Sequence, residues 1–244
     1  RLSGVVLPSW RGHPGMGGLF EGYGVPVFVD NDANLGAVAE YWWGAARGVE
    51  DFTYIKLATG IGSGHMVGGQ IYRGATGVAG EIGHISIDPQ GPQCVCGNRG
   101  CLATYVGSQE LVDRAESLIP EYPDSPLAGG DVTMTSIEDA ALSKDPLSVK
   151  LVEEAALSLG IVLAGVINLM NPAMVILGGG LSRLKEQLVN PLREAVLRRT
   201  LVNSIAASEI RTSDLGPQDI AIGAATYVLQ NALENPRLFP GVVQ

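Results

Sequence analysis

The sequence is poor in cysteine and in basic side chains, and each shortage excludes a class of protein. Only three cysteines occur among 244 residues, and all three lie between positions 94 and 101. Three thiols cannot all pair with one another, and such close clustering is typical of metal binding in a reducing compartment rather than of a disulfide framework. Sixteen Lys and Arg residues stand against 25 Asp and Glu residues, for a net charge of −9. Phosphate backbones repel so acidic a surface, which argues against direct DNA binding by this chain.

Targeting and membrane-spanning segments are also missing from the sequence pattern. The chain opens without an initiator Met, a charged n-region or a small-residue cleavage site, so nothing in it resembles a signal peptide. The longest uncharged helical run, residues 155–170, is short for a membrane span and contains Ser158 and Asn168. We therefore expect a buried core helix at this position, no membrane contact and a cytoplasmic protein.

What the sequence does contain is a globular composition, with strand patterns first and helical patterns later. Apolar residues make up 46% and charged residues 17%, which predicts one large domain or two small lobes with a sizeable core. Short β-branched or alternating runs predict strands at residues 25–29, 52–57, 70–72, 85–88, 174–177 and 209–212, with another strand starting at His65. Helical spacing predicts helices at residues 33–43, 109–119, 136–143, 147–170, 183–199 and 220–233. This order indicates an α/β or α+β fold.

The cysteine cluster has the composition and spacing of a zinc site. Three thiolates fall within eight residues, and Gly97 and Gly100 allow the tight turns that direct them to one point. Zinc takes four nitrogen or sulfur ligands in a tetrahedron, so one more ligand is needed. The chain has only three histidines, and His84 is the one that lies a short excursion upstream. The predicted zinc ligands are His84, Cys94, Cys96 and Cys101; the alternative is three buried, inert cysteines.

Four landmarks in order along the chain resemble the ROK family of sugar kinases and sugar-responsive repressors. The first is residues 30–34, DNDAN, and the second is the glycine-rich run 57–64, LATGIGSG. The third is residues 81–84, EIGH, followed by the cysteine cluster, and the fourth is residues 175–180, VILGGG. Each glycine run alone is a weak signal, but the combination with the zinc signature is specific.

The resemblance implies an α/β fold of the actin-like (RNase H-like) ATPase type, with sugar bound between two lobes. Residues 1–50 would form the end of the N-terminal lobe, and residues 51–244 the C-terminal sugar-binding lobe with a zinc loop at 84–101. The family's first phosphate loop, Asp-x-Gly-x-Thr, does not occur before Val25, so we expect this chain to be a fragment of a longer protein. Family precedent and apolar helix faces predict a homodimer or homotetramer.

The same resemblance assigns sugar-binding roles to Asn31, Asp32, Glu81 and His84. In a kinase, Asp32 would also be the catalytic base that accepts the proton of the sugar hydroxyl. The alternative for Asp32 is a helix N-cap, and the alternative for Glu81 is an ordinary exposed carboxylate. For His84, one imidazole nitrogen would bind zinc while the other donates to a hydroxyl.

The two glycine runs are predicted to approach phosphate or nucleotide through their backbone N–H groups. The alternative is glycine-rich turns with nothing bound, since strand-to-helix turns use glycine in any case. The predicted phosphate-binding residues are Thr59, Gly60, Gly62, Gly64, Gly178 and Gly179.

One departure from the family pattern bears on function. The family has a sugar-contacting glutamate two residues after the last cysteine, where this chain has Ala103. Losing that acceptor costs about 1–3 kcal/mol of binding. With the repressor-like sequence around the cysteines, this favours the sugar-sensing domain of a transcriptional regulator. It would bind a sugar or sugar phosphate, with DNA contacted only through an N-terminal domain absent from this chain.

Two alternatives stay open. The first is an ATP-dependent, glucokinase-like sugar kinase, which would need ATP and magnesium besides the structural zinc. The second is a zinc-stabilised oligomerisation lobe with no working ligand site.

Overall fold

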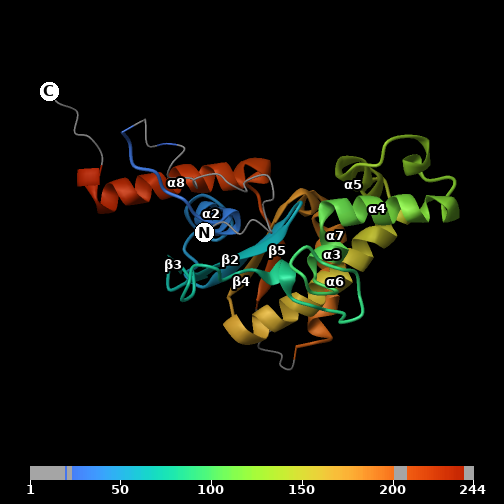
Figure 1. The fold of residues 1–244 in the computed structure, drawn as a ribbon, viewed down its shortest axis with the longest axis horizontal. Coiled ribbons are helices and arrows are strands. Elements are labelled where there is room, and N and C mark those ends of the chain that lie inside the picture. Colours follow the sequence, from blue (N-terminus) through green and yellow to red (C-terminus); the bar gives the residue numbers. More distant parts are fainter. Residues whose placement is uncertain (1–19, 21–23, 201–207, 239–244) are drawn as a thin grey trace.

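The computed structural model describes residues 20, 24–200 and 208–238, which form a mixed five-stranded sheet with helices on both faces (Figure 1). The strand order is β3-β2-β1-β4-β5. Strands β1, β2 and β3 form an antiparallel meander, whereas β4 and β5 run parallel to β1. The strand bounds are Phe52–Leu57 (β1), Ile61–Val67 (β2), Gln70–Ile71 (β3), Met174–Gly179 (β4) and Glu209–Thr212 (β5).

Helices make up most of the rest of the described chain. The α-helices are Asp32–Trp42 (α2), Ala103–Val106 (α3), Ser108–Leu118 (α4), Met134–Leu142 (α5), Pro146–Met170 (α6), Glu186–Leu197 (α7) and Asp219–Glu234 (α8). Short 3₁₀ helices lie at Ile82–His84 (η3), Ile119–Glu121 (η4), Pro126–Gly129 (η5), Gly180–Leu184 (η6), Gly216–Gln218 (η8) and Pro236–Leu238 (η9). The predicted α/β class is therefore confirmed, together with most of the predicted elements.

The two faces of the sheet carry two cores, because successive side chains of a strand point to opposite faces. On β1, Ile55 and Leu57 pack into the large core with α6 and α7. Phe52 and Tyr54 pack into a smaller core with Ala33 and Ala37 of α2. Helix α8 covers α2 on this second face, and Figure 1 shows the two helices together at one side of the sheet.

Helix α6 is the central helix of the large core. It is long and apolar enough to cross a membrane, but 61% of its most apolar window is buried inside the protein. The Asp145 side chain caps its first turn by accepting a 2.9 Å hydrogen bond from the Ser148 N–H, and Asn171 ends it in the left-handed conformation at φ 45°. A core helix is what the sequence predicted for this segment.

Segment 25–29 does not form the predicted buried strand. Its backbone pairs with no other strand among the described residues, and Val25, Val27 and Val29 are 54%, 40% and 55% exposed. Between them, Phe28 packs edge-on against Tyr227 of α8, with 6.0 Å between ring centroids. The prediction rested on a short apolar run rich in β-branched residues, and such a run forms a strand only where another strand pairs with its backbone, which none does among the described residues.

Three further boundaries differ from prediction. Residues 85–88 form no strand beyond a single bridge from Ser86 to Cys101, because the metal-ligand loop turns the chain away. The predicted helix 183–199 is split at Lys185, whose φ of 46° separates η6 from α7. Half of the predicted glycine loop, from Ile61 onward, belongs to strand β2. The lobe boundary at residue 50 stays a prediction, since most of residues 1–23 lies outside the described part.

Candidate functional site

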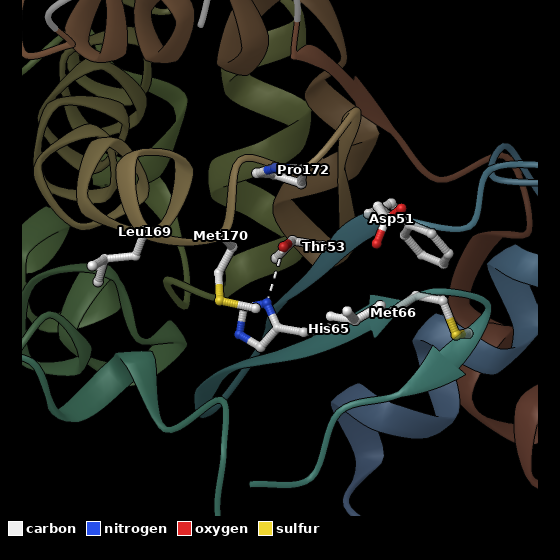
Figure 2. A pocket seen from close by; sticks show the side chains of 9 residues that line it. Asp51, Thr53, His65, Met66, Leu169, Met170 and Pro172 are labelled. Atoms are coloured by element: carbon white, nitrogen blue, oxygen red, sulfur yellow. Dashed lines mark hydrogen bonds between the residues drawn. The ribbon is translucent and has the colours of Figure 1, made fainter.

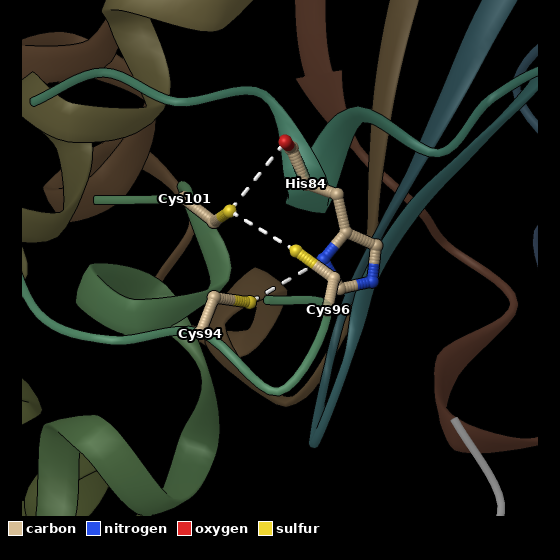
Figure 3. A group of neighbouring side chains, drawn as sticks. All are labelled: His84, Cys94, Cys96 and Cys101. Carbon is tan, nitrogen blue, oxygen red and sulfur yellow. Dashed lines mark hydrogen bonds between the residues drawn. The ribbon is translucent and has the colours of Figure 1, made fainter. Parts of the chain in front are cut away.

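The predicted zinc ligands meet at one point. His84 lies at the end of η3, the three cysteines lie on the loop that follows, and their four ligand atoms are all within 4.8 Å of one another (Figure 3). The Nδ1 atom of His84 is 3.5 Å from Cys94 Sγ, and the Sγ atoms of Cys96 and Cys101 are 3.6 Å apart. A zinc tetrahedron with bonds of about 2.0–2.3 Å has edges of roughly 3.5–3.8 Å. The donor set and its geometry therefore fit zinc.

The loop holds this geometry through its backbone. The N–H of Cys94 donates to the carbonyl of Asn98 over 2.8 Å, and the N–H of Gly97 returns to the carbonyl of Cys94 over 3.0 Å. Gly97 has φ +95°. Gly100 has φ +62°, and a Cβ atom there would lie 1.7 Å from the carbonyl oxygen of Asp88, so no other residue fits. The glycines are required by the turn that gathers the thiols.

The thiols of Cys96 and Cys101 differ in how readily they ionise. Burial, and then the neighbouring thiols of Cys96 and Cys94, raise the pKa of Cys101 to about 12. The N–H of Asn98 and the other thiols lower the pKa of Cys96. A bound divalent cation is what would hold all three as thiolates. Because Nδ1 of His84 faces the cluster, its Nε2 lies on the far side of the ring, directed away from the thiols (Figure 3).

Asn31 and Asp32 lie at the N-terminus of α2. The N-cap is Asn31, whose Oδ1 accepts a 2.8 Å hydrogen bond from the N–H of Ala33, so the capping role considered for Asp32 belongs to its neighbour. Asp32 instead contacts the ammonium of Lys56 through its Oδ2 atom. The lysine side chain is 15% exposed, and the carboxylate is 46% exposed. Sequence reasoning missed Lys56, although a lysine in the otherwise apolar strand FTYIKL was a signal.

Asp30 was also missed as a site residue. Its side chain is only 7% exposed, and its Oδ2 accepts two hydrogen bonds from the guanidinium of Arg73, at 3.0 Å from Nε and 2.5 Å from Nη2. Its Oδ1 accepts from the Asn34 side chain at 2.7 Å and from the N–H of Asn31 at 2.8 Å. Asp30 thus fixes the segment that carries Asn31 and Asp32.

Glu81 is exposed and immediately precedes η3. Glu81 lies three residues before His84, at the N-cap of this turn, and a ligand shared by the two side chains stays a prediction. The segment that leads into Glu81 is held against β2, since the N–H of Ser63 donates to the carbonyl of Gly80 over 2.8 Å. A Cβ at Gly83 would lie 2.3 Å from the carbonyl oxygen of Ile61.

The stretch 61–64 of β2 therefore supports both groups of predicted sugar ligands. A Cβ at Gly64 would lie 2.3 Å from the backbone oxygen of Ala33, at the start of α2. The chain before Glu81 runs along Ser63 of the same strand. Both segments that carry the predicted sugar ligands therefore contact the same stretch of β2.

Most of the predicted phosphate-binding residues fall near one end of the sheet, where Leu57 pairs with both Ile61 and Gly179, whereas Gly64 lies farther along β2, opposite Tyr54. Thr59 and Gly60 form the turn between β1 and β2, and a Cβ at Gly60 would meet nothing within 4 Å. A Cβ at Gly62 would make an ordinary contact, 3.6 Å from the Cβ of Ala33. The other three meet close neighbours: Gly64 lies under α2, Gly178 under the Tyr54 ring, and Gly179 against the backbone of Leu57. Packing explains these three, whereas it does not require a glycine at position 60 or 62. Phosphate binding by these residues stays a prediction.

Comparison with known proteins places the chain in one family. The sequence profile of the ROK family matches residues 7–231. A glucokinase from Halalkalibacterium halodurans is 34% identical over 238 residues, covering 94% of this chain and 72% of its own length. A xylose repressor from Caldicellulosiruptor bescii is 30% identical over 242 residues, covering 96% of this chain but only 61% of its own length.

Solved structures divide between the same two branches. A ROK family glucokinase from Streptomyces griseus, in complex with glucose and AMPPNP, superposes with a TM-score of 0.81 at 33% identity, covering 87% of this chain and 71% of its own. A ROK family transcriptional regulator homologous to the Escherichia coli MLC protein gives the same TM-score of 0.81 at 32% identity, covering 90% and 55%. With the family's landmarks, its actin-like fold and its His/Cys₃ cluster all present, this chain belongs to the ROK family.

Proposed function

We propose that this chain is the sugar-sensing and oligomerisation domain of a ROK-type transcriptional regulator, whose DNA-binding domain is a separate part of the full-length protein. The contact between Lys56 and Asp32 is our main reason to favour a sensor over an enzyme. A catalytic base must offer a free lone pair to the hydroxyl proton. In this chain the Lys56 ammonium contacts Oδ2 of Asp32, so Asp32 would meet a sugar hydroxyl mainly through Oδ1, which we take as a recognition role.

Two further observations support the sensor. Ala103, at the start of α3, offers no carboxylate where the family pattern has a sugar-contacting one. The acidic net charge of −9 is compatible with a chain that leaves DNA contact to another domain. In the proposed mechanism, sugar binds to Asn31, Asp32, Glu81 and His84, and it shifts the relative populations of two lobe arrangements in a homodimer or homotetramer.

Zinc in this proposal is structural. His84, Cys94, Cys96 and Cys101 would hold it, and its charge would keep the three thiols ionised. The rigid loop then fixes the ring of His84, leaving Nε2 to donate to a sugar hydroxyl beside Glu81. We place the protein in the cytoplasm, where thiols stay reduced.

The second candidate is an ATP-dependent sugar kinase, favoured by the 34% identity to a glucokinase. Asn31 and Asp32 are both present, and Thr59 and Gly60 form an open turn at the end of the sheet predicted for phosphate. In that case Asp32 is the catalytic base, and ATP and magnesium are required.

Two experiments in sequence separate the candidates. The zinc-loaded full-length protein is first titrated calorimetrically with a panel of sugars and sugar phosphates. Each ligand that binds is then tested in a coupled ATP-consumption assay. Binding without turnover supports the sensor. Turnover that disappears in Asp32→Asn makes the protein a kinase. If no sugar or sugar phosphate binds, the remaining candidate is the zinc-stabilised oligomerisation lobe.

A further inference from the structure

The contacts found among the described residues hold the loop from Arg73 to Glu81 (the 73–81 loop) at its two ends, which are joined by a 3.2 Å hydrogen bond from the N–H of Ala79 to the carbonyl of Arg73. Residues 74–78 are all exposed, including Val78 at 65%. Gly74, Gly77 and Gly80 have φ values of 69°, 82° and 99°, a conformation that other residues rarely adopt. Glu81, at the end of this loop, is therefore positioned by contacts at residues 73 and 80 before it and by the packing of Gly83 on β2 after it.

The far end of the loop is tied to β2 by a buried polar network. The carbonyl of Gly80 accepts from both the N–H and the hydroxyl of Ser63, at 2.8 and 3.2 Å. The Ser63 hydroxyl also lies 2.9 Å from Nε2 of His65, and Nδ1 of His65 lies 3.0 Å from the hydroxyl of Thr53. Figure 2 shows the Thr53–His65 contact beside a cavity of about 140 Å³, which is lined in part by Leu169 and Met170 at the end of α6.

The near end of the loop is tied to the other half of the predicted sugar site. Arg73 donates twice to the buried Asp30, and its guanidinium also lies over the Tyr227 ring of α8, 5.6 Å from the centroid. Asp30 directly precedes Asn31 and accepts its N–H. One arginine thereby joins the loop that carries Glu81 to the segment that carries Asn31 and Asp32.

We infer that Arg73 is a positioning residue for the sugar site. It sets the placement of Asn31 and Asp32 relative to Glu81 through Asp30, without itself touching the sugar. The inference rests on the proposed sugar site. Its physical basis is that a planar guanidinium paired twice with one buried carboxylate oxygen has one geometry, whereas a single ion pair on flexible side chains has many.

The test compares Arg73→Met and Asp30→Asn, separately and together, with Arg183→Met as the matched control. Arg183 is also half exposed and pairs at 2.7 Å with a buried carboxylate, that of Glu138, but it lies on η6 away from the loop. Glucose and xylose are the probes, and one zinc per chain is confirmed for each variant.

We expect Arg73→Met to weaken binding of the sugar probe at least tenfold while the control binds as wild type. Asp30→Asn should weaken sugar binding by a similar factor. The double variant should bind only slightly more weakly than either single variant, because each single substitution already removes the same ion pair. Arg73→Lys should recover affinity only in part, since an ammonium cannot pair twice in one plane.

Amide hydrogen exchange of the sugar-free variants gives a readout that needs no ligand. In Arg73→Met, exchange should quicken both at residues 77–81 and at residues 31–33, which are 40 or more positions apart in the sequence. If only residues 77–81 change, Arg73 merely holds its own loop and the inference is wrong. If wild type binds neither probe nor any other sugar or sugar phosphate of the titration panel, the proposed function fails while the exchange result still decides the coupling.

Discussion

His84 turns its Nδ1 atom toward Cys94 at 3.5 Å, while its own backbone carbonyl lies 3.5 Å from the thiol of Cys101. The histidine therefore contacts the cluster through both its ring and its backbone. Because Glu81 lies three residues before it, the metal loop and the predicted sugar-binding turn are one continuous piece of chain.

Loss of zinc should therefore abolish sugar binding. Cys96→Ser removes one thiolate and should weaken zinc affinity at least about tenfold, and the sugar response should disappear with the metal. Zinc content by elemental analysis and sugar affinity by calorimetry check both parts. Gln93→Ala is the control, since Gln93 is exposed and its amide only donates to carbonyls of the same loop. Wild-type sugar affinity in zinc-free Cys96→Ser would show that zinc has no structural role at this site.

Lys56→Met should release the Asp32 carboxylate without unfolding the protein. The pair is partly exposed, so we expect the free energy of unfolding to change by no more than about 1 kcal/mol. If Lys56 keeps Asp32 from acting as a base, sugar-dependent ATP consumption should rise in Lys56→Met and vanish in the double variant with Asp32→Asn. The coupled assay measures this directly, and a fall in turnover on removing the lysine would instead assign Lys56 to the chemistry.

The stability of the protein should fall as the pH drops below the ordinary pKa of histidine, 6.5, because burial lowers the pKa of His65. In that range the unfolded chain binds a proton that the folded chain does not, so the free energy of unfolding rises with pH through the window. Urea unfolding at several pH values between about 5 and 7.5 measures the slope. His65→Gln should flatten it, and an unchanged slope in this variant would place the titrating group elsewhere.

Alanine substitutions at two glycines of the run 57–64 should differ in their effect on stability and on nucleotide binding. Gly64→Ala places a methyl group 2.3 Å from the backbone oxygen of Ala33, and overpacking of this kind costs about 1–3 kcal/mol. Gly60→Ala has open space and should leave thermal unfolding unchanged. If the phosphate prediction is right, Gly60→Ala should still weaken nucleotide binding, which titration with AMPPNP measures. Unchanged stability together with unchanged nucleotide affinity would assign no function to Gly60.

Local patterns in the sequence predicted more than long-range ones did. The metal ligands followed from spacing within 18 residues, and β1, β4 and α6 followed from periodicity. The pairs Lys56–Asp32 and Arg73–Asp30 join residues 24 and 43 positions apart, and no periodicity relates them. The strand predicted at residues 25–29 was wrong because an apolar, β-branched run forms a strand only where another strand pairs with it, and the described residues supply none.

The exposed residues 74–78 also have a practical consequence. Both attachments of this loop lie outside the stretch, at Arg73 and Gly80, and each doubling of loop length costs only about 0.6 kcal/mol of closure entropy. A fluorescent reporter peptide inserted between Thr76 and Gly77 would leave both attachments intact while lying close in sequence to Glu81. The same few residues thus offer an insertion point for an optical probe of the proposed sugar ligand.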